Sequence, residues 1–213
     1  MTSKQWKIII GLNLLLATLT ILPFLPGPGF LYSPAQFFFN TGTISGIPGL
    51  FIVSTIFIIW IVRKFKTRKT EGSKKARLIT VLLLTLFTIP FLTSIFLSRP
   101  LRNMSRKIAI ARSDTMISAI EDYKRDKGIY PDKLEELKQE YLSKILSPLI
   151  IGIPEYGYEN TGQSYRITFK QNVIMGFNFE IVAYDPTDRH KAIGEIQELY
   201  DCGIKHWKYY IYD

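Results

Sequence analysis

The chain has 213 residues, a formal net charge of +9 and a hydrophobic content of 47%. Residues 1–112 carry 15 Lys and Arg against one acidic residue, whereas residues 113–213 carry 12 against 17. The basic excess therefore lies beside apolar runs, as in a membrane protein, and does not indicate nucleic-acid binding. The single cysteine, Cys202, excludes an intramolecular disulfide and a cysteine-based metal site, and is expected to be a small, half-buried side chain.

Three apolar runs in the first hundred residues predict three membrane spans, at residues 8–25, 48–62 and 78–97. The first run follows two lysines, as in a signal peptide, but no small-residue cleavage site follows it, so we expect a retained span. The uncharged segment 26–47 contains Pro-Gly-Pro-Gly and an aromatic run. It is expected to be an irregular loop at the membrane interface.

The predicted spans contain no ionisable side chain, which argues against a transporter, a proton relay or an intramembrane enzyme. Asn13, a strongly polar residue within the first span, is expected to make a hydrogen bond between helices. Pro90 is expected to bend the third span.

Positive charge predicts the orientation of these spans. Two lysines lie at the N-terminus and eight Lys and Arg lie in the loop 63–77, whereas five follow the third span between Arg99 and Arg112. Because basic loops stay in the cytoplasm, ten charges against five predict a cytoplasmic N-terminus in a bacterial inner membrane. We expect a membrane domain over residues 1–98, in contact with the lipid bilayer, and an extracytoplasmic domain over residues 99–213.

A long helix is predicted over residues 102–127, which contain no Gly or Pro and repeat apolar residues at helical spacing. Gly128 supplies a helix stop, and Pro131 cannot continue a helix. Asp132 and Glu135 then form a capping-box-like start for a second, short helix. The buried side of that helix is expected to consist of Leu134, Leu137, Tyr141 and Leu142.

The order of these residues resembles the soluble domain of type II secretion pseudopilins and type IV pilins. The resemblance covers about residues 100–170 and rests on the apolar helix, the turn Lys127-Gly128-Ile129-Tyr130-Pro131 and the short helix to Leu137. In that family a small antiparallel sheet follows. The family's N-terminal processing signature, its Asp-Pro-Trp-Gly stretch and its calcium loop are absent here. The resemblance therefore implies a pseudopilin-like fold, and not a processed, polymerising pilin.

Alternation of apolar and polar residues predicts four short strands after residue 155. The strands lie near residues 156–158, 165–170, 177–183 and 206–212. The apolar face of the third strand is expected to consist of Phe177, Phe179, Ile181 and Ala183. Such a sheet is not stable alone, so the long helix is expected to cover it in a two-layer α+β domain.

The most polar cluster, between Asp185 and His190, has two interpretations. A hard cation would take Asp185 and Asp188, together with Glu195 or Glu198, as oxygen ligands. The same composition is common in solvated turns, which is the interpretation we favour. The sequence thus predicts no catalytic, cofactor-binding or metal-binding residue and no cofactor.

The predicted function is non-enzymatic. By resemblance, the external domain mediates protein–protein interaction in the cell envelope with an envelope protein partner, as in a secretion or pilus-like assembly. The candidate contact surfaces are the exposed face of helix 102–127 and the aromatic C-terminal edge, formed by Trp207, Tyr209, Tyr210 and Tyr212. The alternative is a membrane-anchored sensor that binds a small molecule or cation near Asp185–His190.

Overall fold

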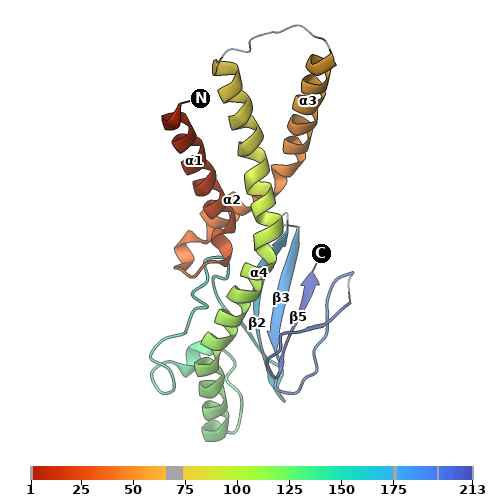
Figure 1. Ribbon diagram of the computed structural model, residues 1–213. Helices are drawn as coiled ribbons and strands as arrows, with labels where there is room; N and C mark the ends of the chain where they lie inside the picture. The colour runs from red at the N-terminus through yellow and green to blue at the C-terminus, as the bar shows by residue number, and fades with distance from the viewer. Residues whose placement is uncertain (1, 66–73, 175–176, 196, 213) are drawn as a thin grey trace.

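Helices occupy one end of the molecule and an antiparallel sheet the other, joined by one very long helix (Figure 1). The computed structural model describes residues 2–65, 74–174, 177–195 and 197–212. Most of the basic loop 63–77, which we predicted to be cytoplasmic, lies outside these residues.

The helical end consists of α1 (Ser3–Ile21), α2 (Tyr32–Ile44), α3 (Gly46–Phe65) and the first part of α4 (Lys74–Lys127). Two short 3-10 helices, η1 (Leu22–Phe24) and η2 (Gly29–Leu31), connect α1 to α2. Thr2 caps α1, because its hydroxyl accepts from the backbone of Gln5 and the Gln5 side chain accepts from the backbone of Thr2.

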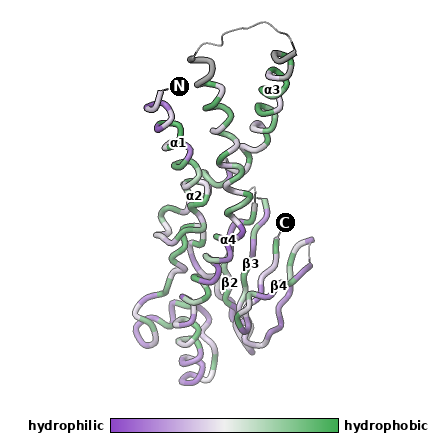
Figure 2. The backbone as a smooth tube through the Cα atoms, in the orientation of Figure 1, coloured by the Kyte–Doolittle hydropathy of each residue, from purple (hydrophilic) through white to green (hydrophobic). Residues whose placement is uncertain are grey.

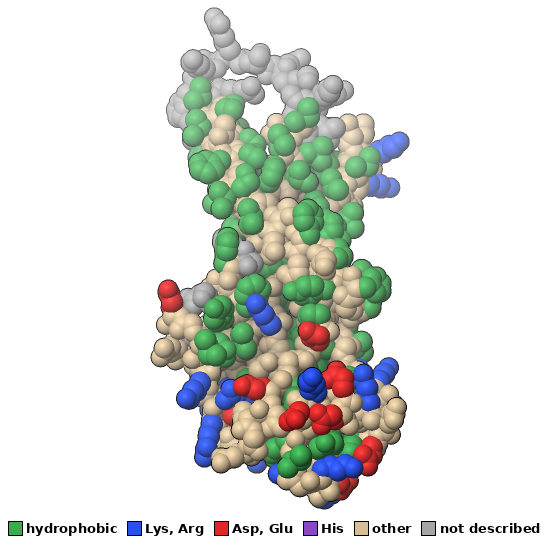
Figure 3. Space-filling view, turned by 180° about the vertical axis from the view of Figure 1, so that it is seen from behind, with side chains coloured by type: hydrophobic (Ala, Val, Ile, Leu, Met, Phe, Trp, Pro, Cys, Tyr) green, Lys and Arg blue, Asp and Glu red, His purple; other side chains and the backbone are tan. Residues whose placement is uncertain are grey.

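Among the described residues, three helical segments are long and apolar enough to cross a membrane: Ser3–Phe24, Gly29–Trp60 and Ile79–Lys127. Most residues of these helices are hydrophobic, as the hydropathy colouring of the backbone shows (Figure 2), and many of their large apolar side chains are exposed. Hydrophobic side chains cover the helical end, whereas charged side chains gather over the sheet end (Figure 3). A chain this apolar on its outside is suited to a lipid environment.

Two predictions about this part were wrong. Residues 26–47 are not an irregular loop, because α2 occupies most of that segment and leads almost directly into α3. The third span and the helix 102–127 are not separate either, since α4 runs through Pro90 and Pro100 without interruption. At about 1.5 Å per residue its 54 residues extend about 80 Å.

Side chains within the helical end hold it together. The predicted interhelical hydrogen bond is confirmed, because Asn13 Nδ2 on α1 donates to Thr85 Oγ1 on α4 at 3.1 Å. Gly46 brings α3 close to α4, where a Cβ atom would lie 2.2 Å from the ring of Phe91. Small residues at such contacts let helix backbones approach closely.

The sheet contains five antiparallel strands in the order β1-β2-β3-β5-β4. They are β1 (Gly157–Asn160), β2 (Tyr165–Ile174), β3 (Asn178–Tyr184), β4 (Tyr200–Asp201) and β5 (Trp207–Tyr212). The C-terminal half of α4 covers one face, as the two-layer α+β prediction required (Figure 1). The prediction of four strands missed β4, which is only two residues long.

The core lies between α4 and the inner face of the sheet. Ile110, Met116 and Ile120 of α4 pack there against Ile167 and Phe169 of β2. The predicted inner face of β3 was wrong: Phe169 pairs with Val182, so Val182 and not Ile181 faces the helix. A shift by one residue moves every side chain of a strand to the opposite face.

The turn after α4 forms as the sequence predicts. Gly128 has a φ of 79°, which suits the left-handed conformation of a helix stop. β1 fixes the following Tyr-Pro, because Tyr158 Oη donates to the Pro131 carbonyl at 2.8 Å and Asn160 Nδ2 donates to that of Tyr130 at 3.1 Å.

The second helix is shorter than predicted. It is a single 3-10 turn, η3 (Leu134–Leu137), so Tyr141 and Leu142 lie beyond its end. The Lys133 amide donates to the carboxylate of Glu136 at 3.2 Å, so the capping partners are not Asp132 and Glu135.

Candidate functional site

A buried polar network joins α4 to the sheet at the point where the apolar part of α4 ends. Arg106 binds Glu180 through both carboxylate oxygens, with Nε–Oε1 at 2.5 Å and Nη2–Oε2 at 2.7 Å. Arg102 Nε lies 3.1 Å from Glu180 Oε2. The Glu180 side chain has no solvent exposure. The network therefore places two arginines of one helix turn around one carboxylate of β3.

Neutral groups complete the network. Gln171 Nε2 donates to Glu180 Oε1 at 2.8 Å, and Ser105 Oγ donates to Gln171 Oε1 at 2.6 Å. The Arg106 guanidinium lies 3.8 Å from the centre of the Tyr209 ring. Bidentate and charge-assisted bonds of this kind are among the stronger contacts in proteins.

Sequence reasoning missed this network because Glu180 was assigned to the solvent face of β3. One signal was available in the chain: Arg102 and Arg106 are four residues apart, so they share a helix face. Both arginines follow directly after an apolar run. An arginine that is buried in such surroundings needs an acidic partner. Glu180 is the single charged residue of β3, which made it a candidate for that partner.

Cys202 lies beside this network and is half-buried against the core, as predicted. Burial raises the pKa of its thiol to about 12. The thiol is therefore protonated at neutral pH, which makes it a poor nucleophile.

The Asp185–His190 segment forms a turn. Asp185 Oδ1 accepts from both the backbone and the hydroxyl of Thr187, at 2.8 and 2.7 Å. The structure adds a residue that lies eighteen positions further along the sequence than Asp188, since His206 Nδ1 lies 3.0 Å from Asp188 Oδ2. Both histidines thus approach the same carboxylate, with His190 Nε2 at 3.8 Å from Asp188 Oδ1.

No cation site is found where the sequence allowed one. Glu198 accepts a hydrogen bond from Tyr200, and within residues 2–65, 74–174, 177–195 and 197–212 no group of three or more His, Cys, Asp or Glu side chains could hold a metal ion. The hydrogen bonds of Asp185 to Thr187 are those of a turn.

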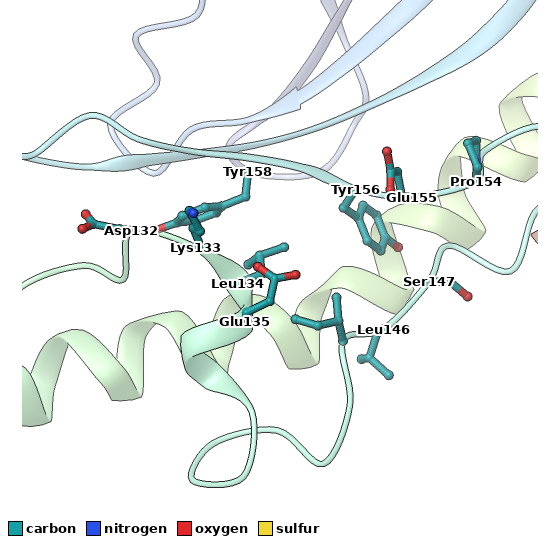
Figure 4. A pocket seen from close by; sticks show the side chains of 11 residues that line it. Asp132, Lys133, Leu134, Glu135, Leu146, Ser147, Pro154, Glu155, Tyr156 and Tyr158 are labelled. Atoms are coloured by element: carbon teal, nitrogen blue, oxygen red, sulfur yellow. The ribbon is translucent and has the colours of Figure 1, made fainter.

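A groove of about 400 Å³ opens between η3 and the start of β1 (Figure 4). Leu134, Leu146 and Tyr156 supply apolar surface. The charged side chains along it are three acids and one lysine, namely Asp132, Glu135, Glu155 and Lys133. The groove therefore combines a net acidic charge with apolar surface.

The two predicted contact surfaces have different outcomes. Along α4, Asp114, Thr115 and Ser118 are exposed on the side away from the sheet, so that face is open. The aromatic C-terminal strand is not an open edge along its whole length, because Trp207 and Tyr210 are buried and β4 pairs with its start. Trp207 belongs to the core, whereas Tyr210 is buried on the opposite face of the sheet.

Comparisons with protein-family models, with curated proteins and with solved structures gave no match. The fold defines a chain with three helices able to cross a membrane, followed by a sheet domain built on the last of them.

Proposed function

We propose that the protein is a multi-span inner-membrane protein whose C-terminal domain acts outside the cytoplasm as a fixed, non-enzymatic protein-interaction module of the pseudopilin-like kind. The observation that carries the proposal is the continuity of α4, which is both a candidate span and the core helix of the domain. A domain built on its own anchor cannot turn freely relative to the membrane.

Two further contacts support a fixed orientation. The first is the Arg106–Glu180 network between α4 and β3. The second is a set of backbone hydrogen bonds between the α1–α2 connection and residues 149–152, among them Gly27 N to Leu149 O at 2.9 Å and Gly152 N to Pro23 O at 2.8 Å. These contacts tie the sheet domain to two separate helices of the apolar part.

The same contacts support the predicted sidedness, because they join the α1–α2 connection to the sheet domain. Three spans place those two parts on the same side of a membrane. The basic loop 63–77 then lies on the opposite side, which the positive-inside rule assigns to the cytoplasm.

The acidic groove is the best candidate for partner contact. Its net acidic charge favours a partner segment with Lys or Arg, and the apolar side chains of the lining, such as Leu146, offer contact to that segment between its charges. Apolar contact surrounded by polar groups is the usual composition of a protein–protein interface. We therefore expect a basic segment of an envelope protein to bind beside η3.

Site-specific photocrosslinking in intact cells tests this proposal. A photoreactive residue at Glu155, on the groove, should give a discrete adduct, whereas one at Gln163, in the exposed β1–β2 turn, should not. The substitution Glu135→Lys should abolish the Glu155 adduct, and Glu195→Lys, an exposed acid elsewhere, should not. Equal adducts from both positions, or insensitivity to Glu135→Lys, would contradict the groove as the contact site.

A second candidate function, a membrane-anchored ligand sensor, is supported by one observation. A cavity beside His190 lies on the face of the sheet opposite α4.

A further inference from the structure

The outer face of the sheet carries a cavity of about 240 Å³, here called the outer cavity. Thr168 of β2, Ala183 of β3 and Lys208 of β5 pair in one row across the sheet, and Ile181 and Tyr210 pair in the next. These side chains point away from α4 because the alternate residues, such as Phe169 and Val182, face the core. The sheet is therefore the floor of the cavity.

The chain between β3 and β4 covers this floor. In the sheet order β5 lies between these two strands, so their connection must pass β5 to reach the far edge. It passes over the outer face, where His190, Lys191, Ile193 and Leu199 line the cavity. Ile193 and Leu199 nevertheless remain 62% and 39% exposed. The cover thus brings apolar side chains to the cavity without burying them fully.

The cavity has an excess of positive charge. Its charged lining residues are Glu159, Arg166, Lys191 and Lys208. Arg166 Nη1 lies 3.6 Å from Glu159 Oε2, and Arg166 Nε lies 3.9 Å from Asp185 Oδ2. These two carboxylates partly balance the positive charge of Arg166. Within the described part of the chain neither lysine has an ion pair within 4.0 Å, so their positive charges are available to an anion.

His190 supplies an unpartnered polar group. Its side chain is 2% exposed, and among the described residues its Nε2 atom has no hydrogen-bond partner. The nearest carboxylate oxygen, on Asp188, is 3.8 Å away, and the other oxygen of that carboxylate is engaged by His206. A buried polar atom without a partner costs free energy, and a bound ligand would recover it.

We propose that the outer cavity binds a small organic carboxylate. Its carboxylate group would meet Lys208, Lys191 and His190, and its apolar part would rest on Ile181 and Tyr210. The cavity volume is that of about eight molecules of liquid water, which is too small for a nucleotide. The single acid of the lining, Glu159, already faces Arg166, so a cationic ligand is disfavoured. This inference is independent of the proposed envelope-interaction function.

Calorimetric titration of the full-length chain in phosphatidylcholine nanodiscs tests the proposal. Benzoate and hexanoate are the probes, with benzyl alcohol as the uncharged analogue of benzoate and inorganic phosphate as the anion without an apolar part. We expect saturable heat from at least one of the two carboxylates, and none from benzyl alcohol or phosphate. No saturable heat from either carboxylate, or equal binding of the alcohol or of phosphate, overturns the proposal.

Variants then assign the heat to this cavity. Lys208→Gln should weaken carboxylate binding at least about tenfold, because a charge-assisted contact is lost. Lys205→Gln, an exposed lysine outside the cavity, should leave the affinity unchanged. His190→Leu should weaken binding, and His190→Gln, which keeps a donor, should retain most of it. An unchanged affinity in a Lys208→Gln protein with wild-type circular dichroism would contradict the site.

Discussion

Glu180 is the residue on which the attachment of the sheet to α4 depends. Two arginines and one glutamine converge on its buried carboxylate. Removing these charges from water costs several kcal/mol, which only their mutual contacts and hydrogen bonds offset. Because bidentate geometry allows little variation, the network fixes the rotation of α4 relative to β3 as well as their contact.

Neutralising Glu180 should therefore destabilise the folded domain. We expect Glu180→Gln to lower the free energy of unfolding by about 3–5 kcal/mol, because the buried Arg106 and the largely buried Arg102 lose the carboxylate that they share. Urea unfolding of the full-length chain in detergent micelles, followed by near-UV circular dichroism, measures this. Glu140→Gln is the matched control, since Glu140 pairs with Lys127 at the surface and should contribute less than about 1 kcal/mol. Equal losses in the two variants would show that the network is not stabilising.

His190 should make stability depend on pH. Burial has the largest effect on the His190 side chain and lowers its pKa below the usual 6.5. The charges of Lys208 and Arg166 also lower this pKa, whereas those of Asp185 and Asp188 raise it. The unfolded chain therefore binds this proton first as the pH falls below about 6.5, and the free energy of unfolding decreases.

Thermal unfolding between about pH 7.5 and 5.5 measures this effect. His190→Gln should flatten the decline, whereas His206→Gln should keep it, because that variant leaves the buried imidazole of His190 in place. A decline of the same size in the His190→Gln protein would assign it to another group.

Among the elements, α4 differs most from its prediction. A proline within a helix removes one backbone hydrogen bond, and for this reason Pro90 was expected to bend the third span. Neighbouring hydroxyls add hydrogen bonds within the helix, from Thr88 to the Leu84 carbonyl and from Ser94 to the Phe91 carbonyl. Packing of α1 and α3 on either side also holds α4 together, which is how helices in membranes tolerate proline.

The contact between α3 and α4 should depend on Gly46. Because an added Cβ would overlap the Phe91 ring, we expect Gly46→Ala to lower the free energy of unfolding by about 1–3 kcal/mol. Gly11→Ala is the control, as no atom lies within 4 Å of its added Cβ. Thermal unfolding in micelles compares the two, and the double variant Gly46→Ala/Phe91→Ala should recover part of the loss. Similar effects of both alanines would exclude close packing as the cause.

At the scale of the whole molecule, orientation is the property on which the proposed function depends. The five positive charges after the third apolar run oppose the predicted orientation. In the folded chain two of them, Arg102 and Arg106, are held by Glu180. The opposing charge available to lipid headgroups is therefore smaller than the sequence count indicates.

A reporter fused after Asp213 should locate the domain. Ten positive charges at the N-terminus and in loop 63–77 predict a signal from a reporter that is active only outside the cytoplasm. Replacing the eight Lys and Arg of loop 63–77 by Gln should weaken that signal, whereas replacing Lys205 and Lys191 should not. A signal only from the cytoplasmic reporter would overturn the envelope function, and a cytoplasmic partner would take its place.

The sequence by itself determined the three apolar segments, the end of the long helix at Gly128 and the α+β class of the domain. These follow from local patterns: continuous hydropathy, helical spacing and turn residues. Asn13 belongs here too, because a polar side chain in an apolar helix needs a partner wherever the neighbours lie.

Only the tertiary structure decided which face of β3 is buried, since both faces of that strand carry apolar residues and the period of two does not choose between them. The pairing of Phe169 with Val182 places Val182 on the buried face of β3. Glu180, two residues before Val182, therefore lies on the same face and contacts Arg106. The approach of His206 to Asp188 and the outer cavity are likewise invisible in the sequence. They exist because the connection from β3 to β4 crosses β5, which is a property of strand order and not of any local pattern.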